Sequence, residues 1–174
     1  NFMIIDSSAL TEQVVDDAIE SGFNGAGQRC SALRILAIQD EVYDKTIKML
    51  SGATEKINIG LPNLINTDIG PVIDLEAKDK INNHINSFKS KVLAQAPLDT
   101  KYKGHFVQPT IIEIIDLKEI NKEIFGPVIH VYRYQADKIE ELVKDINSMN
   151  YGLTLGIQSR IENTINYIFD NASI

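Results

Sequence analysis

The segment Leu33-Arg34-Ile35-Leu36-Ala37-Ile38 is an almost uninterrupted apolar run with one charge. Such a run is typical of a strand buried on both faces, which is the usual situation in a parallel sheet. Other short apolar runs lie on both sides of it and alternate with segments of helical periodicity. We therefore predict an α/β fold, namely an open, mostly parallel twisted sheet with helices on both faces.

The spacing of apolar residues and the positions of turn residues predict the individual elements. Strands are expected at 2–5, 33–38, 91–94, 106–115 (interrupted at Pro109), 128–134 and 153–158, and helices at about 10–22, 40–57, 75–87, 139–146 and 161–169. We expect Asp6-Ser7-Ser8 to cap the first helix and Asp40 the second. Residues 58–71 are predicted to form a loop, and residues 95–104 to be turn-rich and exposed. No linker or repeat divides the chain, so residues 1–174 are predicted to be one domain.

The composition excludes several classes of protein. The 174 residues have a formal net charge of −7, with 44% hydrophobic and 24% charged residues, as in ordinary globular domains. The acidic balance argues against nucleic acid or an anionic membrane surface as a partner. No apolar stretch is long enough to span a membrane. One cysteine cannot form an internal disulfide, so we expect a reducing, cytoplasmic setting.

Cys30, the only cysteine, ends the segment Asn24-Gly25-Ala26-Gly27-Gln28-Arg29-Cys30. Glycines allow unusual backbone angles and close approach of peptide N–H groups, and a thiol near positive charge or amide donors can act as a nucleophile. The alternative is a buried cysteine that acts as a small hydrophobic residue. Arg34 is expected to form a structural ion pair, and adjacent arginine and cysteine side chains are expected to point to opposite faces.

A second segment, Lys122-Glu123-Ile124-Phe125-Gly126-Pro127-Val128, combines a rigid Gly-Pro turn with a carboxylate and an aromatic ring. Glu123 and Phe125 lie two positions apart, so they point the same way in extended backbone. A carboxylate can accept hydrogen bonds from a ribose diol, and a ring can pack on a flat heterocycle. The alternative is a turn with a surface glutamate and a core phenylalanine. The three histidines, His84, His105 and His130, share no metal-ligand spacing, so no metal site is predicted.

These segments together resemble the aldehyde dehydrogenase superfamily, in the order in which that family carries them. Three segments are more specifically similar to the Δ1-pyrroline-5-carboxylate dehydrogenase module of bifunctional bacterial proline-utilization proteins. They are Ala26-Gly27-Gln28-Arg29-Cys30-Ser31-Ala32-Leu33-Arg34, Thr67-Asp68-Ile69-Gly70-Pro71-Val72-Ile73-Asp74 and Tyr151-Gly152-Leu153-Thr154-Leu155-Gly156. The resemblance covers essentially the whole chain.

The resemblance implies roles for four residues. The cysteine matching Cys30 attacks an aldehyde, here glutamate semialdehyde, and forms a thiohemiacetal that becomes a thioester. The residue matching Ser31 helps to hold the substrate carboxylate, although a serine bonded to the backbone is an alternative. The residues matching Glu123 and Phe125 contact the ribose and the ring of the nicotinamide of NAD.

The resemblance also implies that this chain is one part of a longer enzyme. The general base, the NAD-binding domain and the oligomerisation segment of the family match no residues here, and Asn1 resembles the last residue of the segment that carries the base. We expect a homo-oligomer for the complete enzyme, with FAD only if a proline dehydrogenase shares the chain. The isolated chain is expected to have little activity. The alternatives are a non-catalytic module with the same fold, or another aldehyde as substrate.

Overall fold

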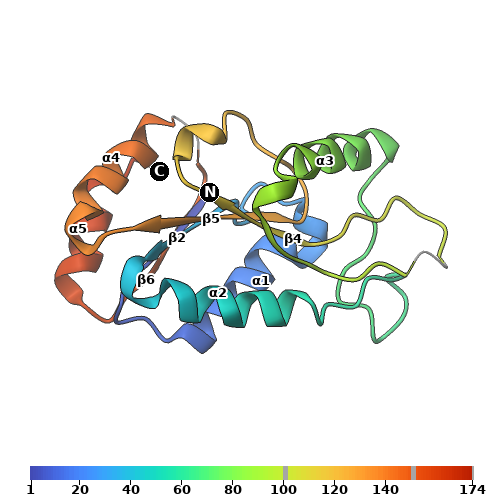
Figure 1. The fold of residues 1–174 in the computed structure, drawn as a ribbon, viewed down its shortest axis with the longest axis horizontal. Helices are drawn as coiled ribbons and strands as arrows, with labels where there is room; N and C mark the ends of the chain where they lie inside the picture. The colour runs from blue at the N-terminus through green and yellow to red at the C-terminus, as the bar shows by residue number, and fades with distance from the viewer. Residues whose placement is uncertain (100–101, 150–151, 174) are drawn as a thin grey trace.

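The structure is a computed structural model that describes residues 1–99, 102–149 and 152–173, and its described strands form one sheet (Figure 1). The strands are β1 (Phe2–Ile5), β2 (Ile35–Gln39), β3 (Val92–Gln95), β4 (Thr110–Ile114), β5 (Val128–Tyr134) and β6 (Leu155–Gln158). Their order in the sheet is β3-β4-β5-β2-β1-β6, and all neighbouring pairs are parallel except β3 with β4. The predicted open, mostly parallel sheet is confirmed.

Helices cover both faces of the sheet, as predicted. They are α1 (Thr11–Phe23), α2 (Asp40–Thr54), α3 (Leu75–Ser87), α4 (Ile139–Ser148) and α5 (Glu162–Asn171). In β5, the side chain of Ile129 faces Gly22 of α1, whereas His130, the next residue, contacts His84 of α3. Because successive strand residues point to opposite faces, α1 and α3 lie on opposite sides, as Figure 1 shows.

The core consists of two clusters that β1 separates, and the first of them also includes Ile81 and Ile85 of α3. Met3 and Ile5 of β1 pack into the cluster that contains residues of α1 and α2, and Phe2 and Ile4 pack into the cluster that contains residues of α4 and α5. The central strands β1 and β2 are therefore buried along their whole length. This explains why their sequences are continuously apolar instead of alternating.

The starts of the first two helices differ from the prediction. α1 begins at Thr11, with Leu10 at the N-cap and no side-chain cap. The Asp6 carboxylate instead accepts hydrogen bonds from the backbone N–H and the hydroxyl of Ser8, which forms a turn before the helix. Asp40 is the first residue of α2 rather than its cap, and its carboxylate pairs with Arg133 of β5.

Three strands are shorter than predicted because they begin later in the sequence. The segments 33–34, 106–109 and 153–154 precede β2, β4 and β6 and are not part of the strands. Within the stretch 95–104, Ala96 is buried and its N–H donates to the carbonyl of Pro109, so this stretch is not exposed throughout. Residues 100 and 101 of that stretch, and Tyr151 of the quoted segment 151–156, lie outside the described residues.

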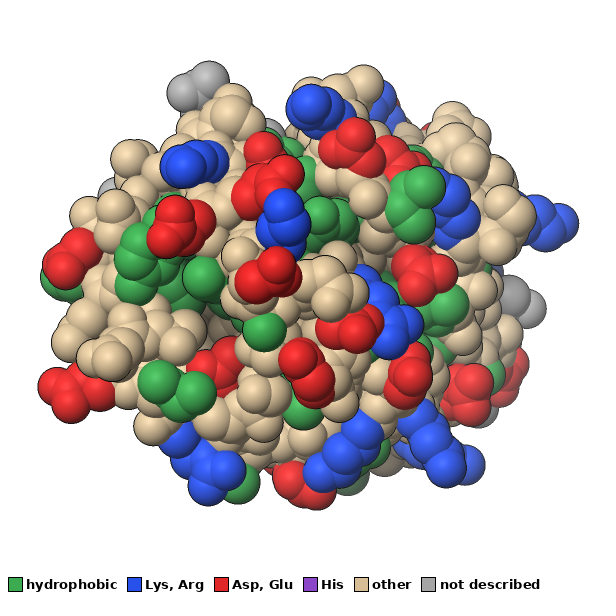
Figure 2. All heavy atoms as spheres, turned by 60° about the vertical axis from the view of Figure 1, so that its left-hand side comes forward, with side chains coloured by type: hydrophobic (Ala, Val, Ile, Leu, Met, Phe, Trp, Pro, Cys, Tyr) green, Lys and Arg blue, Asp and Glu red, His purple; other side chains and the backbone are tan. Residues whose placement is uncertain are grey.

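The surface is mixed in character. Acidic and basic side chains are interspersed with hydrophobic ones on the face that Figure 2 shows, around the side of the molecule that carries α4 and α5. In the described part of the chain, no helix has the length and apolar character needed to cross a membrane.

The helix packing gives a matched pair of glycine substitutions. Gly52 is exposed in α2, and a Cβ there would meet no atom within 4 Å. Gly52→Ala should therefore raise the free energy of unfolding by about 0.5–1 kcal/mol, because alanine has the higher helix propensity. Gly22→Ala in α1 is the control, since its Cβ would lie 2.5 Å from the Cδ1 atom of Ile129. Urea denaturation should show a gain for the first variant only, and an equal gain for both would contradict this packing.

Candidate active site

The residues singled out in the sequence meet at one edge of the sheet, where the parallel strands begin. Asn1 precedes β1, Arg34 precedes β2, Pro127 precedes β5 and Thr154 precedes β6. The register places Phe2 opposite both Ile35 and Leu155, so these starting points are neighbours in space. The site therefore lies at the amino ends of the strands, whereas ligands of open α/β sheets usually bind at the carboxyl ends.

The loop before Cys30 touches the Gly-Pro turn through two glycine backbones. Gly25, Ala26 and Gly27 have φ values of 64°, 54° and 65°, a left-handed turn that costs energy at the alanine. A Cβ on Gly27 would lie 2.2 Å from the carbonyl oxygen of Gly126, so only glycine allows this approach. The contact joins the two sequence motifs and explains the glycine at position 27, whereas a Cβ on Gly126 would lie 2.4 Å from the Cδ1 atom of Ile81.

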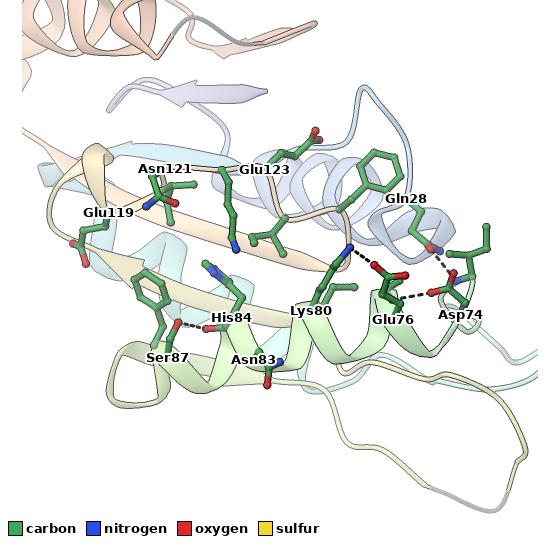
Figure 3. A pocket seen from close by; sticks show the side chains of 18 residues that line it. Gln28, Asp74, Glu76, Lys80, Asn83, His84, Ser87, Glu119, Asn121 and Glu123 are labelled. Atoms are coloured by element: carbon green, nitrogen blue, oxygen red, sulfur yellow. Dashed lines mark hydrogen bonds and ion pairs between the residues drawn. The ribbon is translucent and has the colours of Figure 1, made fainter.

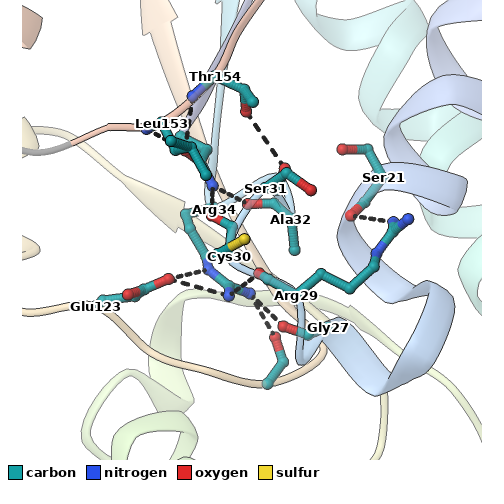
Figure 4. A network of polar contacts seen from close by, with 12 residues as sticks. Ser21, Gly27, Arg29, Cys30, Ser31, Ala32, Arg34, Glu123, Leu153 and Thr154 are labelled. Atoms are coloured by element: carbon teal, nitrogen blue, oxygen red, sulfur yellow. Dashed lines mark hydrogen bonds and ion pairs between the residues drawn. The ribbon is translucent and has the colours of Figure 1, made fainter. Parts of the chain in front are cut away.

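Arg34 connects the same two segments through its guanidinium, which is buried (Figure 4). Nη1 donates to the carbonyls of Gly27 (2.7 Å) and Gly126 (3.3 Å), and Nη2 donates to the carbonyl of Arg29 (3.1 Å). Nε and Nη2 both lie 3.1 Å from Oε1 of Glu123. All five donors of the guanidinium are therefore engaged, and the expected ion pair of Arg34 is formed with Glu123.

The side chain of Asn1 forms a second connection at this edge. Its Nδ2 donates to the carbonyls of Cys30 (2.6 Å) and Ala32 (2.9 Å). Its Oδ1 accepts from the backbone N–H groups of Leu153 (2.7 Å) and Thr154 (3.0 Å). One buried amide thus ties the cysteine turn to the segment before β6, a role that the sequence did not reveal.

Cys30 is exposed in the turn after this loop, which overturns the alternative of a buried structural cysteine. Ser31 is half-buried, and its carbonyl accepts from the hydroxyl of Thr154 at 3.3 Å. Arg29 points away from the thiol, because its guanidinium donates to the carbonyls of Glu20 and Ser21 at the end of α1 (Figure 4). Among the described residues, the backbone N–H of Cys30 has no acceptor, so it can donate to a bound oxygen.

Glu123 and Phe125 point to the same side, as predicted, because both contact Arg34. The guanidinium carbon lies 5.1 Å from the centre of the Phe125 ring, which is 45% exposed rather than in the core. Both residues line a pocket of about 880 Å³ between α3 and the segment 119–125 (Figure 3). Glu123 remains 43% exposed beside this pocket and uses only Oε1 in its ion pair, so its carboxylate can accept from a further group.

Two histidines meet at the wall of this pocket, which His84 helps to line. His84 of α3 and His130 of β5 lie 2.8 Å apart between their Nε2 atoms, although they are 46 positions apart in the sequence. Burial lowers the pKa of His84 to about 4, with a further contribution from the charge of Lys122. Burial also lowers the pKa of His130 to about 3, with a further contribution from His84. Both rings are therefore neutral at pH 7.

In the described ranges, no cluster of three or more histidine, cysteine, aspartate or glutamate side chains could hold an ion. The two paired histidine nitrogens are 2.8 Å apart, which is a hydrogen-bond distance. Two nitrogens on one tetrahedral zinc ion lie about 3.3 Å apart, since each Zn–N bond is about 2.0–2.1 Å.

The family model for the aldehyde dehydrogenase family matches residues 1–174, so the chain belongs to the aldehyde dehydrogenase family. Among curated relatives, the bifunctional protein PutA of Escherichia coli (strain K12) is 49% identical over all of this chain. A 1-pyrroline-5-carboxylate dehydrogenase of Staphylococcus aureus (strain JH1) is 32% identical over 87% of this chain. This chain spans 14% of the first relative and 30% of the second.

Solved structures give the same result for the fold. A crystal structure of a bifunctional proline utilization A (PutA) protein superposes on the whole chain with a TM-score of 0.95 and 42% identity. This chain covers 18% of that chain. A 1-pyrroline-5-carboxylate dehydrogenase superposes with a TM-score of 0.89 and 26% identity. The fold predicted from the sequence is therefore that of the family.

The contacts of Arg34 predict unequal effects at the two ends of its ion pair. Arg34→Lys should lower the free energy of unfolding by about 2–4 kcal/mol, because one ammonium cannot serve three backbone carbonyls and a carboxylate. Glu123→Gln should lower the free energy of unfolding by less than about 1 kcal/mol, because Glu123 is partly exposed and Arg34 keeps its hydrogen bonds to the three carbonyls. Urea denaturation of both variants measures the difference. A larger loss for Glu123→Gln would contradict the role of Arg34.

The paired histidines predict how stability depends on pH. Both folded pKa values lie below the ordinary value of 6.5, so the unfolded chain binds more protons at weakly acidic pH. The contribution of the two neutral rings to the free energy of unfolding is complete above pH 6.5. It is lost as the pH falls toward about 4, by at most about 1.4 kcal/mol per pH unit for each ring. Urea denaturation between about pH 7 and 5 should give a flatter slope for the double variant His84→Gln/His130→Asn than for the wild type. Equal slopes would contradict the pKa assignments.

Proposed function

We propose that residues 1–174 are the cysteine-bearing catalytic domain of an NAD-dependent aldehyde dehydrogenase. The proposed substrate is L-glutamate 5-semialdehyde, which forms from Δ1-pyrroline-5-carboxylate. The enzyme would oxidise it to L-glutamate in proline catabolism. The observation that carries the proposal is that Arg34 donates both to the carbonyl of Arg29, directly before the exposed Cys30, and to the carboxylate of Glu123, which lines a large pocket. The names of the relatives, PutA and 1-pyrroline-5-carboxylate dehydrogenase, support this choice of substrate.

In this proposal Cys30 is the nucleophile. Its sulfur adds to the aldehyde carbon to give a thiohemiacetal, and the backbone N–H of Cys30 donates to the oxygen that gains negative charge. Loss of hydride from the former aldehyde carbon leaves a thioester on Cys30, and water then releases the carboxylic acid. The Ser31 hydroxyl is assigned to the substrate carboxylate, to which it can donate a hydrogen bond.

Glu123 and Phe125 are assigned to the nicotinamide half of NAD. When bound, NAD supplies the chemistry of hydride acceptance. The pocket of about 880 Å³ is large enough for part of a dinucleotide, the partly exposed carboxylate of Glu123 can accept from a ribose hydroxyl, and the exposed ring of Phe125 offers a flat apolar surface. These residues therefore fit the cofactor, and their part is to bind and orient it.

The remaining parts of the enzyme are assigned to sequence outside these 174 residues. The chain spans 14% of its PutA relatives, so the general base, the rest of the NAD site and the oligomerisation segment belong, in this proposal, to a longer polypeptide. That polypeptide is proposed to form a homo-oligomer in the cytoplasm and to carry FAD only together with a proline dehydrogenase. The isolated chain should show little NAD reduction, because a general base alone contributes about 10²–10⁴-fold.

The proposal is tested by three variants in the complete enzyme that contains this chain. Cys30→Ser should lower kcat by about 10³-fold or more, because an alcohol is a far weaker nucleophile at neutral pH. Glu123→Gln should raise KM for NAD by about tenfold, the effect of losing about 1.4 kcal/mol of a charge-assisted hydrogen bond. Glu12→Gln, an exposed carboxylate of α1 that pairs with Lys45, is the matched control and should change neither constant.

The measurement is NADH formation from Δ1-pyrroline-5-carboxylate. A Cys30→Ser enzyme with the kcat of the wild type would refute the nucleophile. No NADH from any aldehyde would favour the alternative of a non-catalytic module, and NADH from other aldehydes alone would change the substrate.

A further inference from the structure

The His84–His130 pair has a definite arrangement of protons, which follows from one carbonyl group. The Nδ1 atom of His130 lies 3.1 Å from the carbonyl oxygen of Arg34. A carbonyl oxygen can only accept a hydrogen bond, so the neutral His130 ring carries its proton on Nδ1. Its Nε2 is then an acceptor, and the 2.8 Å contact with His84 requires that His84 donates from its own Nε2.

This proton arrangement fixes the main chain of Arg34. Its carbonyl accepts from the His130 ring and also from the His130 backbone N–H at 2.8 Å. Its own N–H donates to the carbonyl of Asn1 at 3.2 Å. The backbone of Arg34 is therefore held on both sides, and the direction of its side chain follows from that anchoring.

The surroundings of the two rings favour their neutral forms. His130 is 1% exposed and stacks edge-on against Phe88, and His84 is half-buried on the pocket wall. The charged groups that act on the pair are Lys122 near His84, and Arg34 and Glu119 near His130. The two cations oppose protonation, whereas the carboxylate of Glu119 favours it, and burial is the largest effect on both rings.

We propose that His130 is a positioning residue of the active site: in the Nδ1–H tautomer that the Arg34 carbonyl selects, and paired with the His84 donor, it anchors Arg34, which keeps the Cys30 turn and Glu123 in one arrangement. The importance of that arrangement for catalysis rests on the proposed function, but the tautomers and their effect on the Cys30 turn do not. Neither histidine has a place in the chemical steps, and sequence spacing gave no sign that they meet.

The first test is nitrogen-15 NMR of the histidine rings in the 174-residue chain at about pH 7. The wild type should show a protonated Nδ1 on His130 and a protonated Nε2 on His84. His84→Leu removes the donor to Nε2 but not the Arg34 carbonyl, so His130 should keep its proton on Nδ1, and its Nε2 signal should shift because it has lost a hydrogen-bond donor. His84→Gln keeps an amide donor near the position of Nε2 and should preserve both the tautomer and the Nε2 signal. The opposite tautomers in the wild type, or an unchanged His130 Nε2 signal in His84→Leu, would overturn the proposal.

The second test measures the effect on the site through the rate of Cys30 alkylation by iodoacetamide. Loss of one hydrogen bond changes an equilibrium by about fivefold, so His130→Leu and His84→Leu should change the rate by about that factor. His130→Asn, whose amide replaces the Nδ1 donor, and His84→Gln should stay within about twofold of the wild type. Circular dichroism establishes that each variant is folded, and the pocket-wall variants of His84 provide the test if His130→Leu does not fold.

The outcomes separate this proposal from the proposed function. Equal alkylation rates in all folded variants would overturn the positioning role even in an active dehydrogenase. The same holds if His130→Asn and His84→Gln behave like the leucine variants. The predicted tautomers and rates would support it even if the complete enzyme oxidised no aldehyde, because neither measurement needs NAD or substrate.

Discussion

The structure of the site depends on one buried cation. The Arg34 guanidinium is in the interior because every one of its donors has an acceptor, including the carbonyls of Gly27, Gly126 and Arg29. Removing a guanidinium from water is costly unless it is fully hydrogen-bonded, so these carbonyls must stay where they are. The carboxylate of Glu123 neutralises the charge and remains partly exposed beside the pocket. A single side chain therefore fixes the distance between the thiol loop and the carboxylate.

Other contacts add to this constraint at the same edge of the sheet. Asn1 ties the cysteine turn to the segment before β6, and His130 anchors the backbone of Arg34. Because β1, β2, β5 and β6 all begin here, their hydrogen-bond ladders give these anchors a rigid base. The exposed thiol and Glu123 are thus carried by loops, but the loops are held by buried polar groups. This arrangement suits a site that must orient two reactants.

The sequence predicted much of this, and the failures have physical causes. Continuous apolar runs predicted the buried strands, and helical spacing predicted α3 with its observed bounds. The pattern of residues within a segment carries no information about which strands become neighbours. The approach of Gly27 to Gly126, the amide contacts of Asn1 and the pairing of His84 with His130 could therefore not be foreseen. The Asp6 cap was wrong because a short polar side chain can serve a turn as well as a helix.

In the function proposed for this chain, Cys30 carries the covalent intermediate of an aldehyde dehydrogenase. The most direct measurement is acid quenching of the complete enzyme during turnover with NAD and Δ1-pyrroline-5-carboxylate, followed by mass spectrometry of its peptides. We expect an acyl group on the peptide that contains Cys30, and its loss when the quenched sample is treated with hydroxylamine. Steady turnover with an unmodified Cys30 peptide and the acyl group on another residue would contradict it.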